Sequence, residues 1–193
     1  MKKTIIFSMM VMALFSATSF SQAADYKIDT ENAHAFIAFK VNHLGFSWVM
    51  GRFNKFEGKF SYDEKNPGAF HAEVTVDTTS VDSNQAERDK HLRSKDFFYT
   101  EKFPTAKFVS TSFVEKDGNK AELVGELTLR GITRQVKIDF EHVGHGKDPW
   151  GNYRRGFSGS TVLTLKDFGI EFDLGPQARQ IEVLFSVEGI QQK

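Results

Sequence analysis

Apolar and polar residues alternate in the first long segment of the chain after residue 33. Its apolar face carries Ala35, Ile37, Phe39 and Val41. Polar residues such as Lys40 fall mostly on the opposite face, where Phe36 interrupts the pattern. A two-residue period is typical of a β-strand with one buried face. We therefore predict a half-buried strand here, and after a break at Leu44-Gly45 a second, aromatic-rich strand segment that runs to Phe60.

The same period returns along the rest of the chain. It predicts further strands at residues 70–77, 122–129, 136–141 and 181–187. Short turn sequences punctuate the strands, namely Asn66-Pro67-Gly68, Asp117-Gly118-Asn119, Arg130-Gly131 and Asp148-Pro149-Trp150-Gly151. Alternation indicates antiparallel pairing, because parallel strands usually read as continuous apolar runs. No pause is long or polar enough for an interdomain linker, so we expect a single domain.

Two all-β architectures fit this pattern, a sandwich and a closed barrel. Closure removes exposed strand edges, and a barrel of about eight strands can hold one small ligand. Glycines within or beside the predicted strands favour the barrel because they allow sharp bends. These glycines are Gly51, Gly58, Gly125 and Gly159. The pattern does not decide whether the interior is solid or hollow.

One segment departs from the strand pattern. Residues 83–94 are charged and contain neither glycine nor proline, which predicts a short helix flanked by loops. Arg88, Asp89 and His91 within it would suit an acid–base enzyme. A helix places Asp89 and His91 on different faces, however, because neighbours on a helix surface are three or four residues apart. We therefore expect a structural helix that caps one end of the barrel, with a lid over a tunnel entrance as a secondary alternative.

The first 23 residues have the composition of a cleaved signal peptide. Lys2 and Lys3 precede an apolar centre at residues 5–15, and Ser21-Gln22-Ala23 forms a small-x-small cleavage site. The apolar run is shorter than the roughly 20 residues that a spanning helix needs. We therefore predict a mature chain at residues 24–193, exported to the periplasm, with no stable membrane anchor.

Composition narrows the function. The chain has no cysteine, so neither a disulfide nor a thiol-linked lipid is available. Loss of the two signal lysines leaves 23 basic and 25 acidic residues, a net charge of −2 that does not favour binding to nucleic acid. Seventeen of the 20 phenylalanines remain in the mature chain. So many aromatic rings require a large apolar interior.

Two local motifs resemble catalytic or metal sites without completing one. Lys166-Asp167-Phe168-Gly169 contains the kinase Asp-Phe-Gly triplet, but the other kinase motifs are missing and we predict a strand end and turn. His142 and His145 lack a third ligand at a diagnostic spacing, so we predict a solvated loop and no metal site. His43 continues the apolar face of the first strand and could sit at the barrel interior or mouth.

Many motifs, in order, carry a resemblance to a known family. They are ADYKID, HAFIAFKVNHLGFSWVMGRFNKFEGKF, TTSVDS, ERDKHLRSKDFF, FPTAKFVSTS, GELTLRGITRQV, DPWGNYRRGF and KDFGI. They resemble the YceI-like family of secreted bacterial proteins, and the match runs from about residue 25 to residue 193. The resemblance implies a lipocalin-like extended antiparallel β-barrel with a long internal tunnel. It also implies binding of a polyisoprenoid or a similar amphiphilic lipid, such as an isoprenoid quinone, and a link to stress. It carries over no catalytic residues.

Together these observations predict a non-enzymatic carrier whose bound isoprenoid lipid or quinone is a ligand, with no other cofactor. The residues expected to line the tunnel come from the apolar strand faces and nearby aromatics: Ile37, Phe39, Val41, His43, Phe46, Phe53, Phe56, Val74, Leu127, Ile138 and Phe185. Two alternatives stay open, a lipid-modifying enzyme that uses Arg88, Asp89 and His91, and a solid-core stress protein with a protein partner. Oligomeric state is also open, and a homodimer is one alternative.

Overall fold

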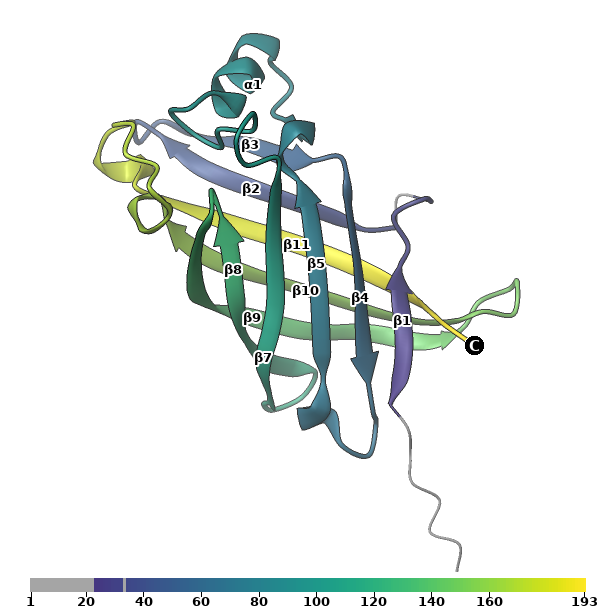
Figure 1. The fold of residues 1–193 in the computed structure, drawn as a ribbon. Coiled ribbons are helices and arrows are strands. Elements are labelled where there is room, and N and C mark those ends of the chain that lie inside the picture. Colours follow the sequence, from purple (N-terminus) through teal and green to yellow (C-terminus); the bar gives the residue numbers. More distant parts are fainter. Residues whose placement is uncertain (1–22, 33) are drawn as a thin grey trace, which may run out of the picture.

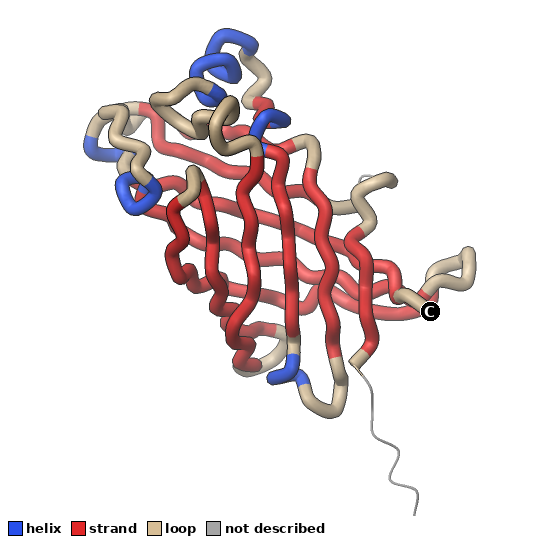
Figure 2. Tube along the Cα trace, in the orientation of Figure 1, coloured by secondary structure: helices blue, strands red, loops and turns tan. Residues whose placement is uncertain are grey.

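The computed structural model describes residues 23–32 and 34–193, most of which form strands (Figures 1 and 2). The predicted signal peptide lies outside the described residues except for Ala23. The strands are β1 (Ala24–Ile28), β2 (Phe36–His43), β3 (Ser47–Phe53), β4 (Phe56–Tyr62), β5 (His71–Asp77), β6 (Val81–Asp82), β7 (Thr105–Glu115), β8 (Lys120–Leu129), β9 (Ile132–Lys147), β10 (Tyr153–Thr164) and β11 (Gln180–Gln191). The helices are α1 (Ala86–Arg93) and the 3-10 turns η1 (Pro67–Ala69), η2 (Thr78–Ser80), η3 (Leu165–Phe168) and η4 (Pro176–Ala178).

All strands belong to one antiparallel sheet, which closes into a barrel with eight strand positions. Five positions are the long strands β7 to β11. Each of the other three is shared by two short strands in succession. β1 and β2 both pair with β11, β4 pairs with β1, and β3 pairs with β2. β5 pairs with β4, and β6 continues it to pair with β3. The pairing between β1 and β11 closes the barrel, as the sequence predicted.

The breaks in these paired strands have local causes. Between β1 and β2 the chain leaves the ladder at Asp29, whose amide still donates to the carbonyl of Glu188 on β11 at 2.7 Å. Between β3 and β4, the amide of Asn54 donates to the carbonyl of Ser80 at 3.1 Å. The bonds across each break hold the two halves of a strand in line although their registers differ.

The predicted helix is shorter than expected. It spans Ala86–Arg93 instead of residues 83–94. Gln85 is the N-cap residue, and its side chain accepts a hydrogen bond from the amide of Arg88. Figure 1 shows α1 at one end of the barrel. Two irregular stretches, residues 83–104 and 165–179, lie at that end, and we call them the lid segments.

The barrel interior holds two clusters of buried side chains. The cluster away from the lid segments contains Tyr26, Ile28, Phe60, Phe70, Ala72, Phe113, Ala121, Leu123, Ile138, Phe140, Phe157 and Val187. The cluster beside them contains Phe39, Val81, Phe97, Phe98, Ala106, Leu129, Val136, Leu163, Leu165, Phe168 and Ile170. Inward-facing residues of the strands thus meet in the middle, as the two-residue period requires. Among the described residues, no helix is long and apolar enough to cross a membrane.

Candidate ligand-binding cavity

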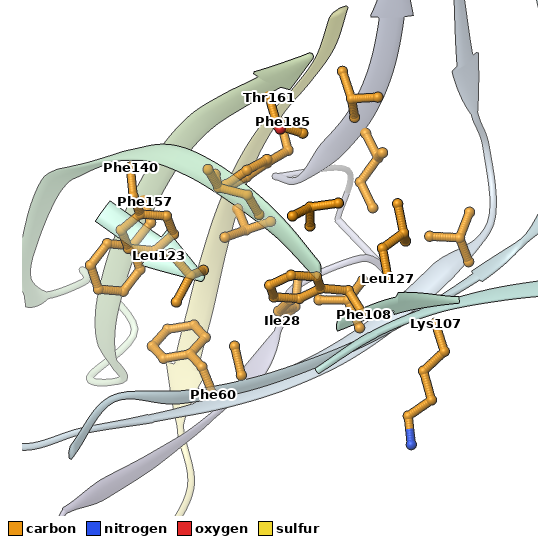
Figure 3. A pocket seen from close by; sticks show the side chains of 18 of the residues that line it. Ile28, Phe60, Lys107, Phe108, Leu123, Leu127, Phe140, Phe157, Thr161 and Phe185 are labelled. Atoms are coloured by element: carbon orange, nitrogen blue, oxygen red, sulfur yellow. The ribbon is translucent and has the colours of Figure 1, made fainter. Parts of the chain in front are cut away.

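A cavity of about 140 Å³ separates the two buried clusters. Its wall is built from β1, β2, β4, β5 and β7 to β11, so that nearly the whole barrel contributes (Figure 3). The lining residues are Ile28, Ile37, Lys59, Phe60, Phe70, Ala72, Val74, Val76, Ala106, Lys107, Phe108, Leu123, Leu127, Val136, Ile138, Phe140, Phe157, Thr161, Leu163, Val183, Phe185 and Val187. A cavity of comparable size lined by Leu, Ile and Phe stays dry and takes up benzene.

The cavity offers a ligand almost no polar group. Lys107 points its amine away from the space in Figure 3. The Thr161 hydroxyl donates to the backbone carbonyl of Lys137 at 2.7 Å, which satisfies its donor. Shape and apolar contact are therefore the properties by which this wall can select a ligand.

Inward-facing glycines make room for aromatic rings along the wall. A Cβ atom added at Gly125 would lie 2.4 Å from Cζ of Phe108, and one added at Gly159 would lie 2.5 Å from Cζ of Phe185. Phe108 and Phe185 both line the cavity. The missing side chains thus let each ring lie against the backbone of a neighbouring strand. The glycines that indicated bends in the sequence also set the width of the cavity.

Five phenylalanines close the cavity at the end away from the lid segments. We call Phe60, Phe70, Phe113, Phe140 and Phe157 the phenylalanine plug, and all five are buried. The ring centroids of Phe140 and Phe157 are 4.8 Å apart, and those of Phe60 and Phe157 are 5.3 Å apart. Such aromatic pairs contribute beyond their buried area. Phe157 is only 1 % exposed, so this plug is a packed part of the core.

At the other end, aromatic side chains from the strands meet those of a lid segment. The ring of Phe98 lies 5.4 Å from that of Phe53 and 6.4 Å from that of Phe39. In the second lid segment Phe168 is buried as well. The lid segments therefore cover this end of the barrel with loops, the short helix α1 and 3-10 turns, and not with paired strands. Segments that are held by side-chain packing open at lower cost than the strands of a hydrogen-bonded sheet.

Beyond the plug lies a polar group of side chains around Arg155 on β10. Arg155 is 2 % exposed, forms an ion pair with Glu64 at 2.5 Å and lies over the Tyr62 ring at 4.2 Å. Its Nη1 lies 3.3 Å from Nε2 of His142. Burial, then the charge of Arg155, lowers the pKa of His142, so the imidazole is neutral at pH 7. Burial and the nearby carboxylate of Glu115 raise the pKa of Tyr62.

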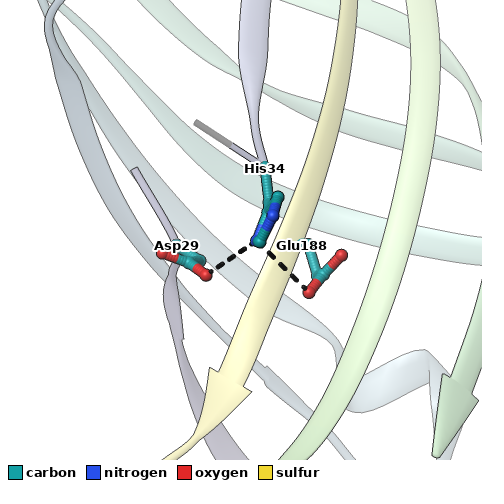
Figure 4. Close-up of side chains that lie close together, drawn as sticks. All are labelled: Asp29, His34 and Glu188. Atoms are coloured by element: carbon teal, nitrogen blue, oxygen red, sulfur yellow. Dashed lines mark hydrogen bonds and ion pairs between the residues drawn. The ribbon is translucent and has the colours of Figure 1, made fainter. Parts of the chain in front are cut away.

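A second charged group fills the break between β1 and β2. Asp29, His34 and Glu188 offer ligand atoms that lie within 4.8 Å of one another, which resembles a metal site (Figure 4). Arg154, however, donates through Nη1 to Asp29 at 2.8 Å and to Glu188 at 2.6 Å. The guanidinium already supplies the positive charge that a metal would bring, so we assign an ion-pair cluster here. Its Nε donates to Asp148 at 2.6 Å.

The Arg154 cluster strongly lowers the pKa of two of its aspartates. Burial raises the pKa of Asp29, but hydrogen bonds from Arg154, Asn32 and His34 outweigh it and lower that pKa to about 2. The pKa of Asp148 is likewise lowered to about 2 by hydrogen bonds from Arg154 and Asn152, against the opposing effect of burial. Both carboxylates are ionised at neutral pH and join separate parts of the barrel rim.

Five of the residues predicted to line the tunnel do line the cavity. They are Ile37, Val74, Leu127, Ile138 and Phe185. Whether they contact a ligand stays a prediction. Phe39 and Phe53 lie in or against the cluster beside the lid segments, and Phe56 packs partly buried against the other cluster. Val41 is half-buried on β2 and does not line the cavity.

Two predicted tunnel residues lie outside the barrel. Phe46 is 86 % exposed in the turn between β2 and β3, and His43 is exposed at the end of β2. The prediction extended the apolar face of β2 beyond the point where other strands enclose it. At the hairpin end, β11 no longer pairs with β2 beyond Val41, so both faces of the hairpin meet solvent and an apolar residue there need not point inward.

Sequence reasoning missed five aromatic residues of the wall, namely Phe60, Phe70, Phe108, Phe140 and Phe157. Phe108 and Phe157 lie outside the strands that were identified from the sequence. Phe157 lies in the run Tyr153–Thr164, where glycine and serine obscure the apolar face. The glycines were the available signal of an inward-facing strand in this run, because Gly159 faces inward beside Phe185.

The possible acid–base group on α1 does not assemble. Asp89 accepts hydrogen bonds from the amide and hydroxyl of Ser83, at 2.8 and 2.5 Å. His91 pairs instead with Asp96 at 3.2 Å, and Arg88 donates to the Ser83 hydroxyl at 2.7 Å. These bonds order the start of the helix and the part of its lid segment around Asp96.

Two other sequence interpretations have different outcomes. His142 and His145 were expected in a solvated loop, which is wrong, because both lie on β9 and pair with β10. Burial of His142 against Phe157 accounts for the difference. Phe168, from the kinase-like triplet, lies in η3 directly after β10, which confirms the predicted strand end and turn.

Comparison with known proteins gives consistent matches. The family model described as YceI-like domain matches residues 26–189. A Pseudomonas aeruginosa relative named UPF0312 protein is 55 % identical over 192 residues, and Protein YceI of Escherichia coli O157:H7 is 51 % identical over 193 residues. Both alignments cover 100 % of each chain. A solved polyisoprenoid binding domain from Saccharophagus degradans superposes with a TM-score of 0.63 at 14 % identity, covering 86 % of this chain and 98 % of that one. At this identity the match shows a shared fold.

Proposed function

The chain belongs to the YceI-like domain family, and we propose that it is a lipid-binding protein that holds the hydrocarbon tail of a polyisoprenoid or similar amphiphilic lipid in its barrel. The observation that carries the proposal is the apolar cavity whose wall is built from nearly every strand of the barrel. A structural neighbour described as polyisoprenoid binding supports the same ligand class. An isoprenoid quinone is one such lipid.

The size of the cavity limits how binding occurs. A volume of about 140 Å³ accommodates roughly one isoprene unit, since a cavity of similar size takes benzene. Each buried methylene contributes roughly 0.8 kcal/mol, so one unit of five carbons contributes about 4 kcal/mol before the costs of binding. A longer tail needs more space, which must come from movement of aromatic rings in the wall or under the lid segments. Binding should therefore be coupled to rearrangement near Phe98 and Phe168.

We propose further that the protein acts in the periplasm as a carrier, with a role in stress. The predicted signal peptide supports export, and the enclosed apolar site suits a lipid that must be shielded from water. The separate bonding of Asp89 and His91 gives no support to a lipid-modifying enzyme at α1.

A cavity-filling substitution tests the proposal. Ile138→Trp places a large ring into the cavity from β9, and Lys137→Trp adds the same ring to the outer face of the same strand. Farnesol binding is measured by titration calorimetry. We expect Ile138→Trp to weaken binding by roughly tenfold or more and Lys137→Trp to leave it unchanged.

Overpacking costs about 1–3 kcal/mol of stability, so circular dichroism and thermal unfolding must show that the Ile138→Trp barrel is folded. If it does not fold, Val183→Phe repeats the test with a smaller increase in volume. Equal farnesol affinity in a folded, filled barrel would contradict binding in the cavity.

A further inference from the structure

The hairpin between β2 and β3 exposes an unusual amount of apolar surface. We call Leu44, Phe46, Trp48 and Met50 the apolar tip. Their exposed fractions are 53, 86, 60 and 56 %, respectively. Soluble proteins expose single apolar side chains commonly, but a contiguous group on one hairpin marks an interaction site or a liability. The sequence predicted Phe46 as an interior residue, but it lies outside the cavity. Ligand binding in the cavity therefore does not explain this exposed ring.

The tip is an ordered turn. The Asn42 side chain accepts a hydrogen bond from the amide of Gly45 at 2.6 Å, and the amide of Phe46 donates to the carbonyl of His43 at 2.9 Å. Leu44 adopts a left-handed backbone with φ of 54°, which is uncommon for a bulky residue and unfavourable. Asparagine or glycine would relieve this strain. The chain instead keeps a leucine that presents apolar surface to solvent.

The tip lies at the end of the barrel covered by the lid segments. A Cβ atom at Gly175, in the second lid segment, would lie 3.7 Å from Cδ2 of Leu44. The same segment exposes a further aromatic side chain, Phe172, at 43 %. At the opposite end of the barrel, the turn between β9 and β10 belongs to the charged cluster of Arg154 and Asp148 (Figure 1). That turn also exposes Trp150, at 78 %, but beside charged side chains and not within a group of apolar ones.

The dimensions of the tip favour one kind of partner. Its exposed side chains offer on the order of 400 Å², whereas a stable dimer buries about 800 Å² on each partner. A narrow convex hairpin also cannot form the groove that an extended peptide or a helix needs. A deformable lipid surface needs neither a large flat area nor a complementary shape. The Lys40 ammonium lies 5.2 Å from the centroid of the Trp48 ring. Tryptophan and lysine side chains suit the boundary between lipid and water.

We propose that the apolar tip docks the barrel onto a lipid bilayer with the lid segments facing the membrane. This inference rests on the proposed function, because a carrier of membrane lipid must meet the membrane. Docking by the tip places the loop-covered end of the cavity at the surface from which the lipid is withdrawn. The charged end then faces water.

Two single-tryptophan variants test this orientation. The chain has two tryptophans, so Trp150→Phe leaves Trp48 alone, and Trp48→Phe leaves Trp150 alone. Trp150 is 78 % exposed at the opposite end of the barrel and is a matched control. The variants are mixed with vesicles of phosphatidylethanolamine and phosphatidylglycerol that contain brominated lipid. We expect quenching and a blue shift of Trp48 emission and no change in Trp150 emission. Quenching of both, of neither, or of Trp150 alone would overturn the orientation.

Binding strength is tested by sedimentation with the same vesicles. Phe46→Ser removes the most exposed ring of the tip without touching the barrel, and Trp150→Ser is its control. We expect vesicle affinity to fall roughly tenfold for Phe46→Ser and to stay unchanged for Trp150→Ser. Equal affinity in both variants would contradict docking by the tip. A concentration-dependent dimer that Phe46→Ser abolishes, without vesicle binding by the parent, would assign the tip to a second copy instead.

The two proposals fail separately. One outcome is that Phe46→Ser binds farnesol in solution as the parent does but no longer withdraws lipid from vesicles. That result supports both lipid binding in the cavity and docking by the apolar tip. If the parent binds vesicles but not farnesol, docking holds and the cavity proposal fails. If it binds farnesol but not vesicles, only docking fails.

Discussion

The ring of Phe185 occupies the space that a side chain on Gly159 would need. The two residues are directly opposite each other on β11 and β10, and a Cβ atom at Gly159 would lie 2.5 Å from Cζ of Phe185. Gly159→Ala should therefore push the ring into the cavity. We expect farnesol affinity to fall roughly tenfold and stability to fall by about 1–3 kcal/mol. Calorimetric titration and thermal unfolding measure the two effects.

The same strand supplies the control for this substitution. A Cβ atom at Gly156 would meet no atom closer than 3.7 Å. Gly156→Ala should leave farnesol affinity unchanged. If both alanine variants bind alike, the glycine beside Phe185 does not set the width of the cavity.

The Arg154 cluster should contribute strongly to stability. Arg154→Met leaves Asp29, whose side chain is 3 % exposed, without its main partner. Breaking a buried ion pair in this way typically costs about 3 kcal/mol or more. Arg134→Met removes an exposed arginine from β9 as a control and should cost little. Urea unfolding of both variants measures the difference, and equal unfolding midpoints would show that the cluster is not stabilising.

Stability should also depend on pH through the same cluster. The pKa of Asp29 falls from 3.8 to about 2 on folding, so its carboxylate stabilises the folded state above about pH 4. That stabilisation is lost progressively as the pH falls from 4 to 2, and Asp148 behaves alike. Thermal unfolding from pH 6 to pH 2 should show the loss, with a shallower slope in Arg154→Met. Parallel slopes in parent and variant would rule out this origin.

The charged residues of α1 should be dispensable for lipid binding. Asp89→Asn weakens the hydrogen bonds to Ser83 and should loosen the lid segment, at a cost of about 1–3 kcal/mol. Hydrogen exchange of residues 83–104 would report that loosening. Farnesol affinity should stay within about twofold of the parent, and likewise for His91→Ala. Loss of binding in both variants would place these side chains at the ligand.

The alternation of residues predicted the inward-facing positions well in the middle of each strand, where one face meets the core and the other meets solvent. Ile37, Val74 and Ile138 illustrate this, since each was assigned inward from its strand and lines the cavity. Turn chemistry placed η3 correctly at the end of β10. The family resemblance resolved the choice between sandwich and barrel that the pattern left open.

Other features depend on contacts between distant segments and were not visible in the sequence. Asp29 and Arg154 are 125 residues apart, and only closure of the barrel brings them together. Phe46 is in phase with Trp48 and Met50 on the exposed face of β3, and it lies in the turn, beyond Val41 where the pairing of β2 with β11 ends. A local pattern reports which face of a strand is apolar, not how far the neighbouring strands extend.

The most direct test of lipid binding is native mass spectrometry of the protein purified from its own cells, followed by solvent extraction of any bound molecule. We expect a stoichiometric increase in mass and release of a polyisoprenoid or isoprenoid quinone. Protein that shows only the mass of its polypeptide, and that stays unchanged after incubation with such lipids, would contradict lipid binding.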